Sequence, residues 1–271
     1  MRLIPIDDGG DPRLASYRTL ADKELMRTSG LFVAEGRLIV QRVIEARRFA
    51  VRSLLLNDAN ARALSDTLTR TLPADVPVFV CATRDFLDIT GFNLHRGCLA
   101  LVERPPSTPP CEILRDARTM VVLEAATDAD NVGGVFRNVA AFGADAVLLS
   151  PTCCDPYYRK AIRTSMGATL RVPFARIDDW PAGLTDLRAT GFTLVALTPR
   201  VGAIPIDEFL SSGKPSRLAF LVGTEGAGLS DLAEQAADAR VKIPIRDAVD
   251  SLNLAVATGI ALARWSALAT H

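Results

Sequence analysis

The segment Asn131-Val-Gly-Gly-Val-Phe-Arg-Asn-Val-Ala-Ala-Phe-Gly143 decides the fold of this chain. It follows the apolar run Met120-Val-Val-Leu-Glu124, and a helix is predicted from Val132. A strand followed by a helix is the unit of parallel α/β sheets, which bind ligands at the carboxyl edge. The segments Gly223-Thr-Glu-Gly-Ala-Gly-Leu229 and Ile243-Pro-Ile to Ser251-Leu-Asn253 also begin where apolar runs stop. We therefore expect all three to form one site.

Strands and helices alternate through the rest of this half of the chain. This pattern predicts an α/β fold with a largely parallel sheet covered by helices on both faces. Further strands are predicted at 146–149, 193–197, 218–222 and 241–244, and further helices from Tyr157, near Leu229 and from Leu252 to Ala267.

A proline-rich stretch, Glu103-Arg-Pro-Pro-Ser-Thr-Pro-Pro110, separates this half from the first. Such a stretch continues neither a helix nor a central strand. We expect a small α/β domain over 1–104, a linker over 105–116 and a second domain over 117–271. In the first domain the pattern predicts helices near 14–28 and after Glu35, and strands at 51–56, 76–81 and 98–102.

The composition excludes some classes of protein but does not identify the function. The 271 residues include 31 basic and 31 acidic residues, so no global field favours nucleic acid or lipid, and RNA would need a local basic patch. Five cysteines without a C-x-x-C pair argue against a disulfide framework. The N-terminus lacks a signal-peptide core and no apolar run is long enough to span a bilayer, so we expect a cytoplasmic protein without membrane contact.

Several familiar α/β chemistries do not fit these residues. A phosphate-binding G-x-x-x-x-G-K-[ST] loop and the nucleophile elbow G-x-S-x-G are missing, and the glycine spacings do not match the dinucleotide fingerprint. His95 and His271 are the only histidines, and both lie outside the three segments, so a Ser-His-Asp triad is hard to build. The cysteines are not spaced as chelating pairs, and we expect no metal.

The three segments, in this order, resemble motifs one, two and three of the SpoU/TrmH family of RNA ribose 2'-O-methyltransferases. Tyr158-Arg-Lys-Ala-Ile-Arg-Thr-Ser-Met-Gly167 is similar to the segment that follows the second strand in that family. Phe32-Val-Ala-Glu-Gly36 and His95-Arg-Gly97 resemble the family's ribosomal-protein-like RNA-binding domain. Thr224 stands where the family usually has asparagine, which is a mild departure beside an intact glutamate.

The resemblance implies a SPOUT domain with a C-terminal trefoil knot that holds S-adenosylmethionine. Knotted chains are very rare among protein folds, so the knot is expected from the family resemblance alone. The resemblance also implies a homodimer with active sites shared across the interface, for which the terminal helix 252–267 offers an apolar face, although such a face more often belongs to the core.

Family correspondence assigns Arg137 to activation of the ribose hydroxyl. Arginine does not release its proton in proteins, so its safer role is to bind the adjoining phosphate and stabilise the developing alkoxide. An ordinary surface ion pair is the alternative. Around Arg137, the correspondence places four further catalytic residues and five cofactor-binding residues: Asn131, Glu225, Ser251 and Asn253, and Thr198, Gly223, Gly228, Ile243 and Leu252.

Most of these residues also have plain structural readings. Asn131 and Ser251 suit helix N-caps, Asn253 suits a first-turn polar residue, and Glu225 suits the start of a helix. Gly223, Gly226 and Gly228 suit a turn with positive φ. A local basic cluster, Arg159, Lys160 and Arg163 with Ser165, is either a solvated helix face or a phosphate contact. In the first domain Arg18, Arg27 and Arg37 are candidate RNA contacts.

The function expected from the sequence is S-adenosylmethionine-dependent methylation of a ribose 2'-hydroxyl of RNA. Ribosomal RNA is favoured over transfer RNA because the first domain resembles that of ribosomal RNA enzymes. Three alternatives stay open: a transfer RNA target, methylation of a base nitrogen, and a non-catalytic RNA-binding or ribosome-assembly protein that retains the pocket.

Overall fold

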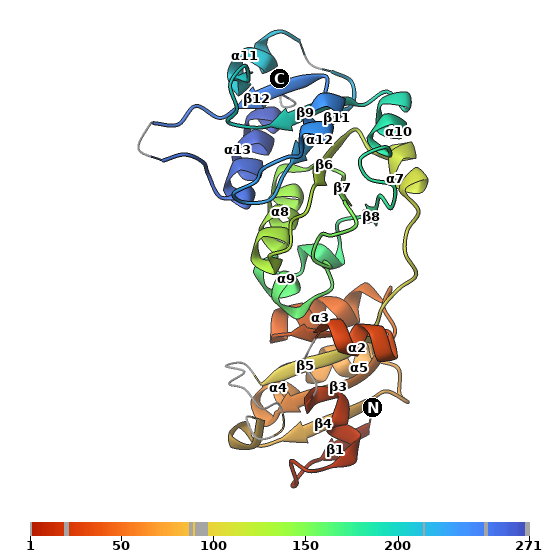
Figure 1. Ribbon diagram of the computed structural model, residues 1–271. Coiled ribbons are helices and arrows are strands. Elements are labelled where there is room, and N and C mark those ends of the chain that lie inside the picture. The colour runs from red at the N-terminus through yellow and green to blue at the C-terminus, as the bar shows by residue number, and fades with distance from the viewer. Residues whose placement is uncertain are drawn as a thin grey trace. The chain divides into compact units, whose positions relative to one another are not determined.

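The computed structural model describes residues 2–18, 22–86, 89, 97–213, 215–246 and 249–268. The chain forms two compact units: the first contains residues 1–106 and 157–170, and the second contains residues 107–156 and 171–271. Figure 1 shows their elements. Each unit is described here by itself.

The first unit is a mixed five-stranded sheet in the order β1-β4-β3-β5-β2. Strand β4 pairs in parallel with β1 and β3, while β5 is antiparallel to β3 and β2. Its strands are β1 (Arg2–Pro5), β2 (Leu31–Glu35), β3 (Val51–Asn57), β4 (Pro77–Cys81) and β5 (Cys98–Glu103). Its helical segments are η1 (Pro12–Leu14), α1 (Ala15–Arg18), α2 (Asp22–Ser29), α3 (Arg37–Ala46), α4 (Asp58–Ala63), α5 (Ser65–Thr71), η2 (Thr83–Asp85), α9 (Arg159–Thr164) and η3 (Ala168–Leu170).

The segment 157–170, expected in the second domain, packs in the first unit. Tyr157 stacks on Phe32 with 4.9 Å between ring centroids, and it meets Phe49 edge-on at 6.4 Å. Arg42 donates from Nη1 to the carbonyl of Met166 at 2.7 Å. These aromatic contacts bury Tyr157, so long-range packing rather than chain order decides which unit holds this segment.

The second unit is built on a seven-stranded sheet in the order β10-β12-β9-β11-β6-β7-β8, and every described pair in it is parallel. This confirms the predicted α/β fold with a parallel sheet. Its strands are β6 (Thr119–Leu123), β7 (Ala146–Leu149), β8 (Phe174–Arg176), β9 (Thr193–Leu197), β10 (Ile204–Pro205), β11 (Leu218–Val222) and β12 (Ala239–Lys242). Its helices are α7 (Pro110–Asp116), α8 (Ala129–Phe142), α10 (Leu184–Ala189), α11 (Ile206–Ser211), α12 (Asp231–Ala236) and α13 (Leu254–Ala267).

Helices cover both faces of this sheet because alternate side chains of each strand point to opposite faces. Figure 1 shows α8 and α13 on one side and α7 and α10 on the other. The core on the α7 and α10 side contains Val122, Leu148, Leu194 and Leu221, all essentially inaccessible to solvent. The trefoil knot expected from the resemblance stays a prediction.

The proline-rich linker is shorter than the predicted 105–116. Residues 110–116 form α7, with Pro110 in its first turn, where a missing backbone N–H costs nothing. Ile113 and Leu114 of this helix are buried in the core of the second unit. The apolar side chains that follow the prolines therefore place these residues in the second unit rather than in a linker.

Candidate functional site

The first motif begins helix α8, and its cap is not the predicted residue. Asp128 is the N-cap, with its carboxylate accepting from the backbone N–H of Asp130 at 2.7 Å and of Asn131 at 3.1 Å. Asn131 lies one turn further along and is buried, with 9% of its surface exposed. Since Asp128 already caps the helix through these two N–H groups, the Asn131 side chain is available for another contact.

The second motif is a tight glycine loop after β11. A Cβ atom on Gly223 would lie 2.1 Å from the backbone carbonyl of Gly228, so no other residue fits there without moving the loop. The loop closes through a backbone hydrogen bond from Gly228 to Thr224 at 3.0 Å. Gly226 and Gly228 have φ angles of 83° and 71°, which glycine adopts without strain.

The third motif ends at Asn253, which caps α13. Its Oδ1 accepts from the backbone N–H of Ala255 at 2.9 Å and of Val256 at 3.2 Å. The sequence assigned the cap to Ser251 and a first-turn position to Asn253. The helix begins two residues later than expected, because Asn253 supplies the acceptor for its free N–H groups.

The Asn253 side chain also joins the three motifs. Its Nδ2 donates to Oδ1 of Asn131 at 2.7 Å and to Oε1 of Glu225 at 2.6 Å. One amide thus caps a helix with its oxygen and bridges two other segments with its nitrogen. We call Asn131, Glu225 and Asn253 the amide junction.

Helices α8 and α13 approach closely beside this junction. A Cβ atom on Gly134 would lie 2.6 Å from Cβ of Ala255, so the helices touch where α8 lacks a side chain. Asn138 donates from Nδ2 to the carbonyl of Ala255 at 2.6 Å. At 3.6 residues per turn, Asn131, Gly134 and Asn138 share one face of α8, and this face holds the two helices in register.

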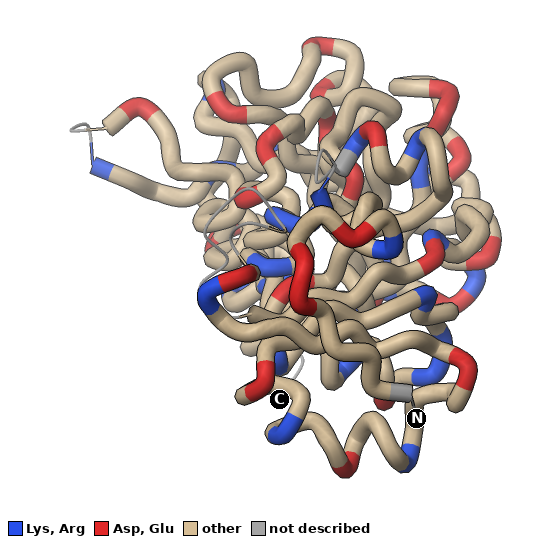
Figure 2. The backbone as a smooth tube through the Cα atoms, turned by 90° about the horizontal axis from the view of Figure 1, so that it is seen from below, with Lys and Arg blue, Asp and Glu red and all other residues tan. Residues whose placement is uncertain are grey.

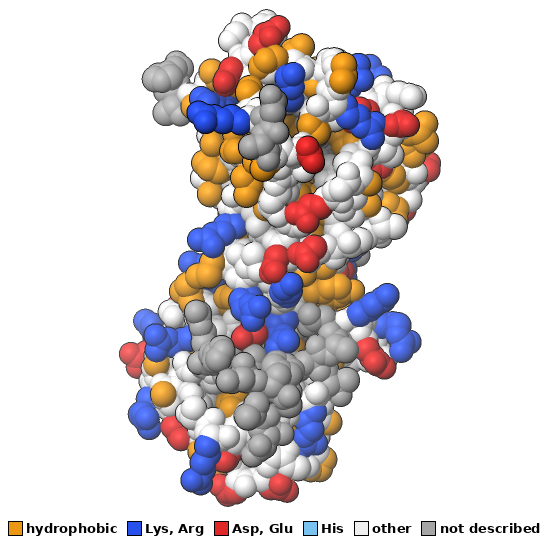
Figure 3. Space-filling view, turned by 60° about the vertical axis from the view of Figure 1, so that its left-hand side comes forward, with side chains coloured by type: hydrophobic (Ala, Val, Ile, Leu, Met, Phe, Trp, Pro, Cys, Tyr) orange, Lys and Arg blue, Asp and Glu red, His pale blue; other side chains and the backbone are white. Residues whose placement is uncertain are grey.

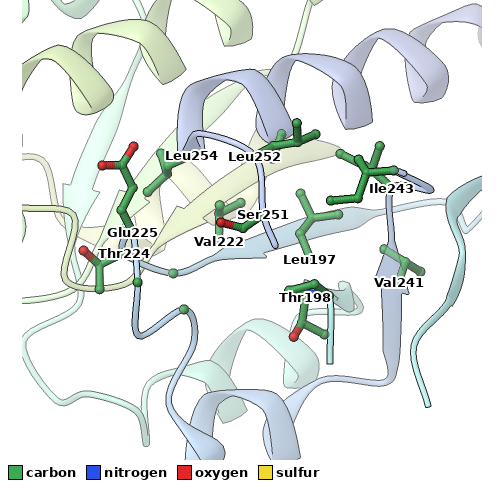
Figure 4. A pocket seen from close by; sticks show the side chains of 16 residues that line it. Leu197, Thr198, Val222, Thr224, Glu225, Val241, Ile243, Ser251, Leu252 and Leu254 are labelled. Carbon is green, nitrogen blue, oxygen red and sulfur yellow. The ribbon is translucent and has the colours of Figure 1, made fainter. Parts of the chain in front are cut away.

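A pocket lies at the carboxyl edge of β9, β11 and β12, where the glycine loop and the start of α13 meet (Figure 4). Its walls are largely apolar, with Leu197, Val222, Val241, Leu252 and Leu254 lining it together with backbone of the glycine loop. All five predicted cofactor residues line it: Thr198, Gly223, Gly228, Ile243 and Leu252. Two predicted catalytic residues, Glu225 and Ser251, line it as well.

Arg137 is the predicted catalytic residue that the structure leaves apart. It is exposed on α8, next to Asn138 and about 100° around the helix from the face that contacts α13. Within the described residues its guanidinium has no hydrogen bond or ion pair. The alternative reading as a surface ion pair is therefore not what the structure shows, and the guanidinium is available for a ligand.

The local basic cluster 159–165 belongs to the first unit. Arg159 lies 3.5 Å from the buried carboxylate of Glu35. Lys160 and Arg163 are exposed, while Ser165 is buried and donates to the carbonyl of Ile162 at 2.9 Å. This cluster combines one ion pair to a buried carboxylate with two exposed cations.

The first-domain candidates have mixed surroundings. Arg18 donates to the backbone carbonyl of Asp11 at 2.8 Å, and Arg27 lies 4.0 Å from Glu24. Arg37 is exposed at the start of α3. His95 and His271 lie outside the described residues.

Sequence reasoning missed part of this site. Leu197, Val222 and Val241 line the pocket because each lies at or near the carboxyl end of a parallel strand. That position was readable from the predicted strands. The contact of Asn138 with α13 carries no comparable sequence signal, since it depends on a helix more than a hundred residues away.

Metal-ligating clusters and membrane-spanning helices are both absent from the described residues. No group of three or more His, Cys, Asp or Glu side chains there is arranged to hold a metal ion. In the same residues, every helix is too short or too polar to cross a membrane.

A parallel α/β unit with a glycine-lined pocket at its carboxyl edge belongs to the class of ligand-binding α/β proteins. Comparison with known proteins identifies the family within this class. Residues 118–263 match the model of the SpoU rRNA Methylase family. Relatives from Mycobacterium bovis and Mycobacterium tuberculosis, each named an uncharacterized tRNA/rRNA methyltransferase, are 39% identical over 258 residues, covering 94% of this chain and 88% of theirs. The chain belongs to the SpoU rRNA Methylase family, as its three motifs predicted.

Solved structures share the fold over nearly the whole chain. An AdoMet-bound rRNA methyltransferase from Sinorhizobium meliloti is similar with a TM-score of 0.80 and 24% identity, covering 96% of each chain. A structure described as an RNA 2'-O ribose methyltransferase has a TM-score of 0.75 and 23% identity, covering 99% of this chain and 98% of its own.

Proposed function

We propose that this protein transfers a methyl group from S-adenosylmethionine to a ribose 2'-hydroxyl of RNA, with ribosomal RNA as the target. The observation that carries the proposal is the amide junction at the edge of the glycine-lined pocket. It brings one polar residue from each of the three family motifs into direct contact. Family membership supplies the reaction class.

The pocket suits an adenosyl group. Apolar side chains from β9, β11 and the segment before α13 offer flat contact for a purine, and loop backbone supplies polar groups at its rim. Thr198 and Ser251 add hydroxyl groups to the lining (Figure 4). These residues would hold the methyl donor, and the glycine loop lets backbone approach it closely.

When bound, S-adenosylmethionine supplies a methyl group activated by a sulfonium. The protein has to align the ribose hydroxyl and accommodate the negative charge that develops as its proton leaves. Arg137 suits this role because guanidinium groups in proteins are cationic and this one is exposed on α8. It binds the adjoining phosphate and stabilises the developing alkoxide.

Glu225 and Asn131 act through the junction. Glu225 is exposed and has its carboxylate fixed by Asn253, so it is presented at a set position beside the pocket. Asn131 fixes Asn253 from the other side. A preorganised carboxylate orients the ribose or the guanidinium without a conformational search.

RNA has to be held by local charge. Lys and Arg are interspersed with Asp and Glu along the chain (Figure 2), and the face in Figure 3 carries both signs. In the first unit, exposed cations include Arg37, Lys160 and Arg163. We propose that these contact phosphates, and that the protein works as a cytoplasmic homodimer.

The experiment follows a radioactive methyl group from S-adenosylmethionine into RNA from cells that lack this protein. We expect incorporation into ribosomal RNA at a linkage that resists alkaline cleavage, because ribose methylation removes the 2'-hydroxyl nucleophile. Arg137→Ala should abolish incorporation, and Arg137→Lys should retain a measurable part.

Each other outcome selects a different function. Incorporation into transfer RNA alone would overturn the proposed target, and a linkage that remains alkali-labile would indicate a base nitrogen. RNA binding without uptake of the methyl donor would indicate a non-catalytic RNA-binding protein. Sedimentation of the purified protein tests the homodimer.

A further inference from the structure

A buried carboxylate, Glu124, lies directly after β6 in the second unit and has 7% of its surface exposed. Three neutral groups donate to it. Its Oε1 accepts from Nε1 of Trp180 at 2.6 Å and from Oγ of Ser230 at 2.7 Å, and its Oε2 accepts from the backbone N–H of Ser230 at 2.8 Å. In each of these contacts a carboxylate oxygen is the acceptor.

The same residue holds both ends of the glycine loop. At the start of the loop, the backbone N–H of Glu124 donates to the carbonyl of Val222 at 2.9 Å. At its end, the carboxylate holds Ser230, whose hydroxyl also accepts from the N–H of Ala233 as the N-cap of α12. Gly223 to Leu229 therefore span between two points fixed on one residue.

A glycine-rich loop needs such fixing because glycine has the largest conformational freedom to lose. Gly223, Gly226 and Gly228 line the pocket together with Thr224 and Glu225. If the end of the loop at Ser230 were released, the pocket wall and the Glu225 carboxylate would lose their set position. The affinity for a ligand of this pocket would then fall.

The fold itself gives no reason for a charge at this place. No cation pairs with the Glu124 carboxylate among the described residues, so neutral donors alone offset its desolvation. A buried charge without a counter-charge is costly, and an apolar side chain of similar size would avoid that cost. The strong hydrogen bonds that a carboxylate makes to the loop end are what it adds.

We propose that Glu124 is a positioning residue that fixes the glycine loop and thereby sets the affinity of the pocket for the methyl donor. This inference rests on the proposed function, since it takes S-adenosylmethionine as the ligand. Glu124 acts through Ser230 and Trp180 rather than through contact with the donor.

The test measures binding of S-adenosylhomocysteine, the demethylated product, to the full-length protein by calorimetry. Glu124→Gln keeps the size of the side chain but places an amide NH₂ against groups that are themselves donors. We expect its Kd to rise about tenfold or more, as the loss of a hydrogen bond to a charged group would produce. Ser230→Ala should raise Kd in the same direction, and Ser230→Thr, which keeps the hydroxyl, should stay near wild type.

Trp265→Phe is the matched control. It removes the hydrogen bond from Trp265 to Thr119 at the opposite end of β6, at 2.9 Å, without touching the loop. We expect it to lower the unfolding temperature and leave Kd unchanged, which separates a loss of stability from a loss of loop position. In the double variant Glu124→Gln with Ser230→Ala, the effects on Kd should not add, because both changes release the same loop end.

The outcomes are distinguishable. If the wild-type protein takes up no S-adenosylhomocysteine, the proposed function fails. If the wild type binds and both Glu124→Gln and Ser230→Ala bind equally well, the positioning role is overturned. Should Glu124→Gln not fold, Ser230→Ala and Trp180→Phe decide the question, and unchanged Kd values in both would reject the inference.

Discussion

At the scale of single residues, two atoms of the Asn253 side chain have different structural roles. Its amide oxygen caps α13 and its amide nitrogen joins Asn131 and Glu225. The two roles can be separated by substitution because aspartate caps a helix as well as asparagine does, but has no nitrogen to donate.

Asn253→Asp should therefore keep the helix and break the amide junction. The new carboxylate would face Glu225 across the position of a 2.6 Å hydrogen bond, and like charges repel. We expect methyl transfer to fall at least tenfold while the unfolding midpoint stays close to wild type. Kinetics and thermal unfolding of the same preparation check this prediction.

Asn253→Ala is the comparison for that variant. It loses the cap as well, so we expect its free energy of unfolding to be about 1 kcal/mol lower than that of Asn253→Asp. Full activity in the aspartate variant would show that the junction is not needed for catalysis.

The cysteines allow a second prediction at this scale. Burial raises the pKa of Cys81 to about 11 and that of Cys98 to about 12, and Cys153 and Cys154 are also buried. Because the thiolate is the reactive form, only the exposed Cys111 should react promptly with a thiol reagent at pH 8. The other four should react after unfolding. Prompt reaction of two or more thiols in folded protein would contradict this.

The same shifts bear on alkaline stability. A thiol whose folded pKa is raised keeps its proton longer in the folded state than in the unfolded state. The stability it contributes is complete below about pH 9, the ordinary value, and is lost as the pH rises through 11 to 12. The denaturant midpoint should fall over this window.

Most residues of the candidate site were predictable from the sequence because they lie inside glycine-rich motifs. Their local roles were less predictable. Asp128 and Asn131 both suit an N-cap, as do Ser251 and Asn253, and only the backbone decides which one caps. Glu124 carries no signal of its own, since its partners lie far away along the chain.

At the scale of elements, the glycine loop after β11 depends on close backbone approach. Gly223→Ala places a methyl group 2.1 Å from the backbone of Gly228, which cannot yield as a flexible side chain could. We expect the loop to shift and binding of the methyl donor to be lost. Calorimetry with S-adenosylhomocysteine measures this.

Gly226→Ala is the matched variant in the same loop. Its Cβ atom would meet nothing within 4 Å, and only the φ angle of 83° opposes it, at a cost of about 1–2 kcal/mol. We expect weakened but measurable binding. Equal binding by the alanine variants at 223 and 226 would show that close approach is not what the pocket requires.

The longer strands were predictable because they are continuous apolar runs. β6, β7, β9 and β11 lie where the sequence placed them. β8 and β10, with three and two residues, are too short to produce such a run. The observed helix starts differ from the predicted ones by up to three residues, because capping rather than apolar periodicity fixes where a helix begins.

At the scale of the whole molecule, the segment 157–170 belongs to the first unit although second-unit sequence flanks it on both sides. A linear sequence with one proline-rich stretch predicts one boundary. The tertiary contacts of Tyr157 with Phe32 and Phe49 could not be read from it.

Tyr157→Ala should destabilise the first unit selectively. It removes a buried aromatic ring, at a cost of about 3–5 kcal/mol. Hydrogen exchange should accelerate in β2 and β5, while the amides of β6 and β11 in the second unit should keep their protection. Phe142→Ala, a partly exposed aromatic change in the second unit, is the control and should leave β2 unaffected. Equal acceleration in both units in the Tyr157 variant would contradict the assignment.

The stacking of Tyr157 on Phe32 also has a consequence for folding on the ribosome. When residues 1–106 have emerged, the ring that covers Phe32 has not yet been synthesised. During synthesis, domains ordinarily fold one after another, starting with the N-terminal domain. Here the first unit cannot complete its fold until the ribosome has translated β6, α8 and β7, and until then its aromatic surface at Phe32 stays uncovered. Nascent chains stalled before residue 157 should therefore be preferred clients of chaperones.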